Sequence, residues 1–68
     1  MKLPIGQLIQ ITIDENREPL LAIVTDECGN GTYELTRVVD EKVIKSLIPY
    51  HELVRNFSSG HFKLILDW

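Results

Sequence analysis

Three apolar runs separated by turn-forming residues constrain the fold of this chain more than any other feature of its sequence. The runs span residues 7–13, 20–25 and 32–39, and the segments between them are rich in Asp, Asn, Gly and Pro. Turns favour these residue types, each for its own conformational reason. β-Favouring runs of this length, broken by such clusters, are typical of antiparallel strands joined by hairpins. Residues 6–39 therefore predict three consecutive strands of one sheet.

Side chains in the first and third runs alternate between two faces. In the first run Ile9, Ile11 and Ile13 share one face, and Leu8 lies on the other. Alternation with a period of two indicates a strand with one buried face. The middle run is apolar at every position from residue 20 to residue 24, which fits either a central strand covered on both faces or a long, bent strand as in a barrel.

Residues 40–57 have two interpretations. As sheet, Asp40 and Glu41 form a tight turn, residues 43–48 are a fourth strand, and residues 49–54 are a single helical turn. As helix, apolar residues at intervals of three and four form a stripe over residues 40–57. Pro49 argues against a continuous helix, because proline in a helix interior costs about 3 kcal/mol, whereas it is favoured at a helix start. We therefore predict a strand followed by a short helix.

The end of the chain alternates again after a break at Ser58, Ser59 and Gly60. Residues 61–68 are predicted to form the final strand, with Phe62 and Leu64 on one face. We expect Trp68 to pack against the core or a sheet edge, because aromatic side chains gain much from burial.

The length of 68 residues leaves room for one domain, residues 1–68, with one core. A domain of this size buries only about 60% of the surface of its unfolded chain. Its one cysteine, Cys28, has no second cysteine for an internal disulfide. Good packing or association with another chain must therefore stabilise the fold.

The charge pattern argues against nucleic acid as a partner. The formal charge is −3, and the seven basic residues are scattered singly along the chain. Binding to a phosphate backbone requires clustered Lys and Arg. No apolar run is long enough to span a membrane, and the start lacks the apolar segment of a secretory signal. We expect a cytoplasmic protein with no membrane partner.

The reactive side chains form no recognisable catalytic or metal-binding arrangement. Cys28 lies in a turn without a neighbouring cation to activate it, and His51 and His61 lack the spacing of metal ligands. The chain has no Gly-rich phosphate loop and no paired CxxC motif. We therefore expect no enzymatic activity, no cofactor, no metal and no small-molecule substrate.

The order of two motifs resembles that of small Src-homology-3-like barrels of the Tudor, KOW and Sm types. The segment Gly6-Gln7-Leu8-Ile9-Gln10-Ile11 is similar to their opening Gly-x-x-Val-x-Val strand. Residues 48–54 are similar to the hydrophobic-Pro-x-x-x-Leu turn before their last strand. The resemblance implies a mainly β fold, a small five-stranded barrel with one short helical turn. The alternative is an α+β fold, an antiparallel sheet with one helix over residues 40–57.

Two surfaces are candidates for binding a partner. The first is an apolar outer face of the sheet, predicted to carry Leu8, Val24 and Ile65 on the phase opposite the isoleucines of the first strand. The second is an acidic rim, because the first and third connections of a meander lie at the same end of the sheet. The rim comprises Asp14, Glu15, Glu18, Asp40 and Glu41.

These features predict a non-enzymatic protein-binding or adaptor domain that acts as a homodimer or with another protein. A nucleic-acid-associated regulatory module is a second possibility. It requires four basic residues to converge on one surface, namely Arg37, Lys45, Arg55 and Lys63. A structural small subunit of a larger complex is a third possibility.

Overall fold

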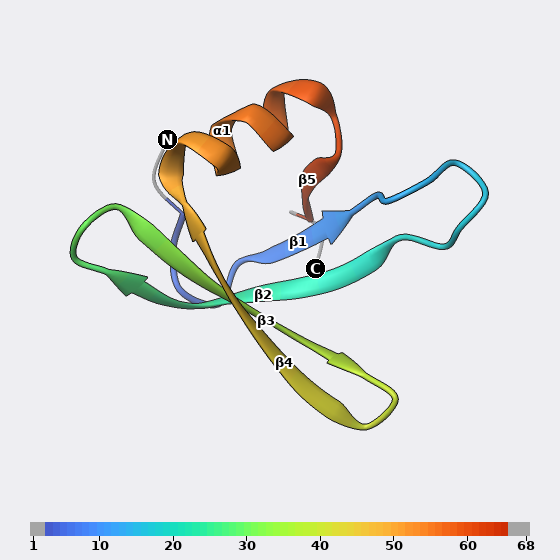
Figure 1. Cartoon of the computed structure of the whole chain (residues 1–68), viewed down its shortest axis with the longest axis horizontal. Helices are drawn as coiled ribbons and strands as arrows, with labels where there is room; N and C mark the ends of the chain where they lie inside the picture. Colours follow the sequence, from blue (N-terminus) through green and yellow to red (C-terminus); the bar gives the residue numbers. More distant parts are fainter. Residues whose placement is uncertain (1–2, 66–68) are drawn as a thin grey trace.

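This computed structural model describes residues 3–65. They form one antiparallel sheet and one helix, joined by turns and loops (Figure 1). The predicted mainly β fold of five strands with a short helix is confirmed. The elements are β1 (Leu8–Ile11), β2 (Leu20–Cys28), β3 (Thr32–Val39), β4 (Lys42–Pro49), α1 (Tyr50–Ser59) and β5 (Phe62–Ile65).

The strand order in the sheet is β4-β3-β2-β1-β5. The first four strands form a meander, and β5 then returns to pair with β1. The sheet is not closed into the barrel that the resemblance implied, because β4 and β5 do not pair and remain its two edges. The ten-residue helix α1, about 15 Å long at 1.5 Å per residue, joins these edges where a single turn was expected.

Proline and glycine set the two ends of α1. Pro49 precedes the helix with φ −66° and ψ 151°, which is the extended geometry that proline adopts. Gly60 follows it with φ 88°, and its N–H donates to the carbonyl of Phe57. Residues 43–48 are extended, so the helix over residues 40–57 does not form. The helix is longer than the predicted turn because the apolar stripe continues to Phe57, which packs against the core.

The turn predicted at Asp40 and Glu41 is confirmed. Both residues have positive φ, 51° and 65°, and they join the paired residues Val39 and Lys42. A two-residue connection with positive φ at both positions is a type I′ turn, whose twist matches that of the strands it joins.

The first strand is shorter than its alternating run. The ladder of β1 ends at Ile11, although the N–H of Thr12 still donates to the carbonyl of His61 over 2.7 Å. Ile13 lies beyond the ladder and is exposed, so it does not join the core with Ile9. For the last strand, the structure describes Phe62–Ile65, and the prediction for Trp68 lies outside the described residues.

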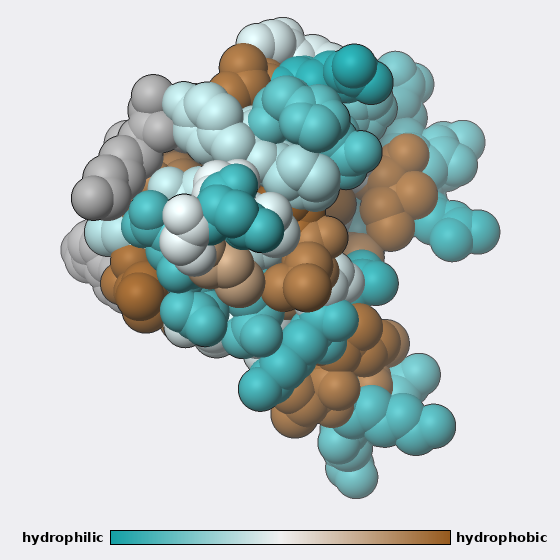
Figure 2. All heavy atoms as spheres, turned by 60° about the vertical axis from the view of Figure 1, so that its left-hand side comes forward, coloured by the Kyte–Doolittle hydropathy of each residue, from teal (hydrophilic) through white to brown (hydrophobic). Residues whose placement is uncertain are grey.

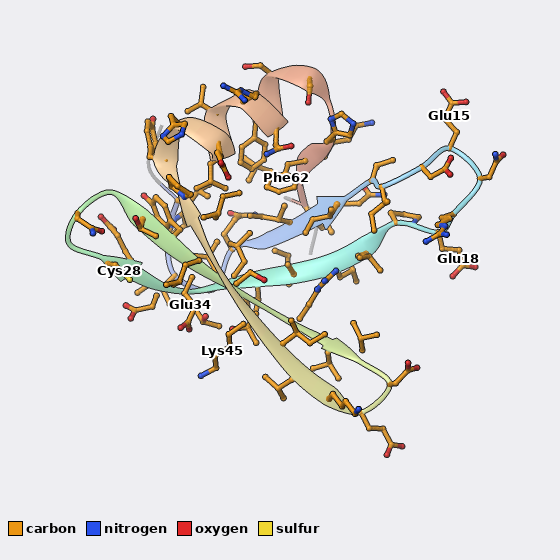
Figure 3. The ribbon with its side chains drawn as sticks, viewed as in Figure 1. Glu15, Glu18, Cys28, Glu34, Lys45 and Phe62 are labelled. Carbon is orange, nitrogen blue, oxygen red and sulfur yellow. The ribbon has the colours of Figure 1, made fainter. Side chains whose placement is uncertain are left out.

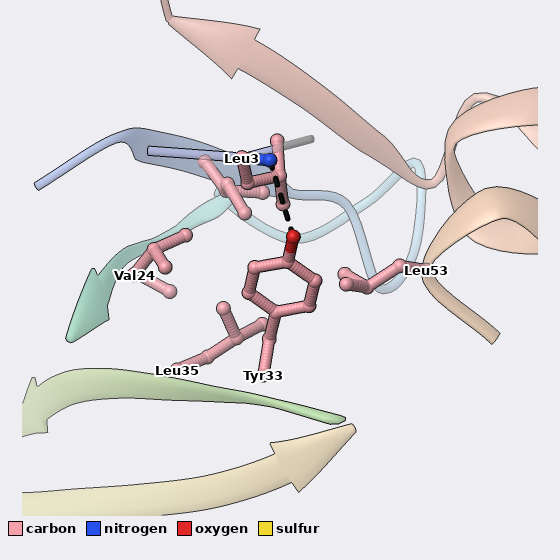
Figure 4. Packing of buried hydrophobic residues seen from close by; sticks show 7 residues of the cluster. Leu3, Val24, Tyr33, Leu35 and Leu53 are labelled. Carbon is pink, nitrogen blue, oxygen red and sulfur yellow. Dashed lines mark hydrogen bonds between the residues drawn. The ribbon is translucent and has the colours of Figure 1, made fainter. Parts of the chain in front are cut away.

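The core lies between the sheet and α1, and we call the sheet face that carries it the core face. Leu53 of α1 packs there with an exposed fraction of 1%. The hydroxyl of Tyr33 accepts a hydrogen bond from the N–H of Leu3 over 3.4 Å (Figure 4). This bond satisfies the polar end of a buried aromatic ring. The buried cluster comprises Leu3, Ile9, Ala22, Val24, Tyr33, Leu35 and Leu53.

Val24 lies in this core with an exposed fraction of 0%, so its predicted place on the outer face is wrong. The ladders explain the error, because Ala22 lies opposite Ile9 and Val24 lies opposite Leu35. A β-bulge between Val24 and Asp26 then changes the phase of β2. Periodicity alone does not show which face of a uniformly apolar strand is buried.

Candidate functional site

The face of the sheet opposite α1 carries apolar side chains with no covering element among residues 3–65. We call this the outer face. On this face Leu8 of β1 lies opposite Ile65 of β5, and Val38 of β3 lies opposite Val43 of β4. We call its apolar residues the outer-face patch, which comprises Leu8, Leu21, Ile23, Val38, Val43, Leu47 and Ile65.

Four residues of the outer-face patch are strongly exposed. Leu21, Val38, Val43 and Leu47 have exposed fractions between 58% and 68%, while the other three are half-buried. Figure 2 shows apolar side chains on the lower arm of the molecule, which is the tip of the β3–β4 hairpin. A shallow hollow of about 250 Å³ is lined by four patch residues of β1, β2 and β3 together with Ala22, Thr36 and Arg37. The patch residues around this hollow form one apolar area, whereas Lys45 lies between Val43 and Leu47 on β4. Exposed apolar areas of this kind are characteristic of interaction sites.

The structure does not bring the predicted acidic residues together. Asp14, Glu15 and Glu18 lie in the β1–β2 connection, whereas Asp40 and Glu41 form the β3–β4 turn. All five are exposed. These connections lie at the tips of two diverging hairpins, and Glu15 and Glu18 mark one tip (Figures 1 and 3). The right-handed twist of the sheet separates the tips, so the acidic residues form two clusters rather than one rim.

The four basic residues that a nucleic-acid site requires also lie apart. Arg37 is on the core face, because it shares the phase of Leu35 and lies opposite Ile44. Lys45 lies opposite Thr36 on the outer face, and Lys63 lies opposite Gln10 on the same face. Arg55 is exposed on α1. No single surface of the described residues therefore collects all four cations.

A cleft of about 250 Å³ lies between β4, α1 and β5, at the place where the sheet stays open. We call it the seam cleft. Most of its walls are apolar, and three polar side chains reach it from β3, β4 and α1, namely Arg37, Ser46 and Glu52. The apolar lining comprises Ile11, Ala22, Leu35, Leu47, Ile48 and Phe62.

Sequence reasoning missed the seam cleft because it assumed a closed barrel. One signal was present in the sequence, since Arg37 follows Tyr33 and Leu35 on the same phase of an apolar run. A charged residue on a core-facing phase is unusual, because an ionised group is costly to bury. Arg37 is half-buried as a residue, and its guanidinium makes no hydrogen bond or ion pair among residues 3–65.

The structure places Cys28 and His61 in different parts of the fold. Cys28 is half-buried at the end of β2, and the ring Nδ1 of His61 hydrogen-bonds the hydroxyl of Ser59 over 2.7 Å. Residues 3–65 contain no group of three or more His, Cys, Asp or Glu placed to hold a metal ion. They also contain no helix with the length and apolar character needed to cross a membrane.

Comparison of the chain with protein-family models, with curated proteins and with solved structures finds no match. The two surfaces that can carry a function among the described residues are the outer-face patch and the seam cleft.

Proposed function

We propose that the chain is a non-enzymatic protein-binding domain whose outer-face patch contacts its protein partner. The exposure of Leu21, Val38, Val43 and Leu47 on three neighbouring strands supports this proposal. Burying an aliphatic side chain of this size contributes about 1.5–3 kcal/mol, which is large beside the marginal stability of a small domain. A partner that covers the patch therefore stabilises both the complex and the fold.

The acidic residues at the tips of the β1–β2 and β3–β4 hairpins are proposed to speed the approach of the partner. Glu15 and Glu18 mark one tip and Asp40 and Glu41 the other, so a partner that approaches the sheet meets negative charge at two places. Such charges accelerate the approach of a partner with complementary basic groups more than they strengthen the final complex. The proposed place of action is the cytoplasm, an expectation that rests on the sequence.

The test compares two sets of lysine substitutions at exposed apolar positions. Val38→Lys combined with Leu47→Lys places two charges in the outer-face patch, and Ile5→Lys places one on the segment before β1. All three side chains are largely exposed, so we expect the variants to keep the wild-type melting temperature. The control residue Ile5 lies outside the sheet.

Association is measured in two ways. Sedimentation at micromolar concentration detects a homodimer, and affinity capture from cells expressing the tagged chain detects another protein. We expect the wild type and Ile5→Lys to associate and the double variant to lose the same complex. A wild type that stays monomeric and retains the same proteins as the double variant would contradict the proposal.

A further inference from the structure

The position of Arg37 in the sheet places a cation on a face that is otherwise apolar. Its neighbours on the same phase of β3 are Leu35 and Val39, and its partner on β4 is Ile44. Arg37 is half-buried as a residue, and its guanidinium has no hydrogen-bond or ion-pair partner among residues 3–65. A cation in such surroundings is stabilised when an anion reaches it, because partial burial removes part of its hydration without replacing it.

The floor of the seam cleft reaches the core. Ala22 and Leu35 are both buried members of the core cluster, yet both line the cleft. Phe62 forms a side wall beneath α1 (Figure 3), and its ring packs edge-on against Phe57 at a centroid distance of 5.7 Å. This contact holds the wall in place, so the cleft offers a preformed apolar surface beside the charge of Arg37.

Charge distinguishes the ligands that suit this cleft. A guanidinium binds a carboxylate with two parallel hydrogen bonds, which a neutral amide or an amine cannot reproduce. Glu52 also lines the cleft, from the first turn of α1, and it forms no ion pair with Arg37. Because Glu52 is exposed, solvent and salt weaken its repulsion of a bound anion without removing it.

We propose that the seam cleft binds a small apolar carboxylic acid. The apolar body lies against Ile11, Leu35 and Phe62, and the carboxylate accepts hydrogen bonds from Arg37. A cavity of 150 Å³ holds benzene, so by proportion a cleft of about 250 Å³ accommodates a ligand of about ten non-hydrogen atoms. Most residues that line this site lie on the opposite side of the sheet from the outer-face patch, and Leu47 belongs to both. Binding of a small acid here is a separate function from the proposed protein binding.

The experiment is an NMR titration of the isotope-labelled chain with three probes of matched shape. The probes are 3-phenylpropionate, 3-phenylpropanamide and 3-phenylpropylamine, which carry a negative, a neutral and a positive head group. We expect the carboxylate to shift the signals of Ser46, Ile48 and Phe62 and to bind about tenfold more tightly than the amide. Equal affinity for the three probes, or tighter binding of the amine, overturns the proposal.

Substitutions of Arg37 and of Glu52 should change the affinity for 3-phenylpropionate in opposite directions. Arg37→Gln should weaken binding of 3-phenylpropionate about tenfold and leave binding of the amide unchanged. Glu52→Gln should strengthen binding of 3-phenylpropionate about twofold, because it removes a screened repulsion. Arg55→Gln is the matched control, since Arg55 is exposed on α1 and does not line the cleft. An Arg37→Gln variant that binds 3-phenylpropionate like the wild type refutes the assigned role of Arg37.

A blocking variant tests the cleft without removing a charge. Ser46 is an exposed residue at the edge of the cleft, so Ser46→Leu places an apolar side chain there with little effect on the fold. We expect this variant to lose binding of the carboxylate and the amide alike. Unchanged binding by Ser46→Leu places the ligand elsewhere and overturns the proposed site.

Discussion

Leu8 of β1 lies directly opposite Ile65 of β5, in the ladder that attaches the last described strand to the sheet. Both side chains are half-buried on the outer face, and the side-chain amide of Gln7 donates to the carbonyl of Ile65 over 3.1 Å. The pair therefore links the two ends of the described chain and also forms part of the outer-face patch.

Replacing Ile65 by lysine should weaken both stability and association. Because Ile65 is half-buried, we expect Ile65→Lys to lower the free energy of unfolding by about 1 kcal/mol. Urea denaturation measures this change, and sedimentation measures the loss of any complex. Lys63→Gln is the control, because Lys63 is an exposed residue of the same strand. An Ile65→Lys variant that matches the wild type in both measurements would show that the Leu8–Ile65 pair contributes nothing.

The attachment of the helix α1 to the sheet should depend mainly on its one buried side chain. Leu53 is the one buried residue of α1, so Leu53→Ala should lower the free energy of unfolding by about 2–5 kcal/mol. A loss of that size is a large part of the stability of a small domain. Val54→Ala is a matched control on the next residue, which is exposed, and should cost about 0.5 kcal/mol or less. Equal effects of the two variants in denaturant unfolding would contradict the packing described for α1.

The β3–β4 turn should gain stability from glycine. Glu41 has φ 65°, and the left-handed conformation costs a residue with a side chain about 1–2 kcal/mol. Glycine removes that cost but adds freedom to the unfolded chain, so Glu41→Gly should raise the free energy of unfolding by about 0.5–1 kcal/mol. Glu15→Gly is the control, because it removes the same charge at a residue without positive φ. A melting temperature that falls in Glu41→Gly would rule out the strain inferred at this turn.

The hydroxyl of Thr25 should stabilise the β-bulge of β2. It donates to the carboxylate Oε1 of Glu34 over 2.6 Å and lies 2.8 Å from the hydroxyl oxygen of Thr36. Thr25→Val preserves the shape of the side chain but leaves the half-buried Glu34 without this donor, so it should cost about 1–2 kcal/mol. Thr12→Val should be nearly neutral, because the hydroxyl of Thr12 makes no hydrogen bond among residues 3–65. Thermal unfolding of the two variants checks this difference.

Much of the fold could be predicted because its signals are local. The alternation of Ile9 and Ile11 with their neighbours indicated the first strand, and Asp40 and Glu41 indicated a two-residue turn. Pro49 separated a strand from a helix where the apolar stripe alone suggested one long helix. The end of that helix was missed, because the stripe continues one turn further, to Phe57, before Gly60 ends it.

The candidate site was predicted less well. Leu8 and Ile65 do lie on the outer face, but Val24 does not, and the most exposed apolar residues of that face were not singled out. The sequence suggests for Arg37 only a place among four cations of a nucleic-acid site, whereas its place in a cleft depends on β4 and β5 remaining apart.

The sequence by itself determined which segments form strands and turns and where the helix starts, because backbone preferences and side-chain periodicity act over a few neighbouring residues. Only the tertiary structure decided which face of β2 is buried, because the register with β1 and β3 places Val24 in the core. The tertiary structure also decided that the two hairpin tips with their acidic residues point apart and that a cleft lies beside Arg37. Those features depend on the accumulated twist of the sheet and on the length of α1, which act between residues that are distant in the sequence.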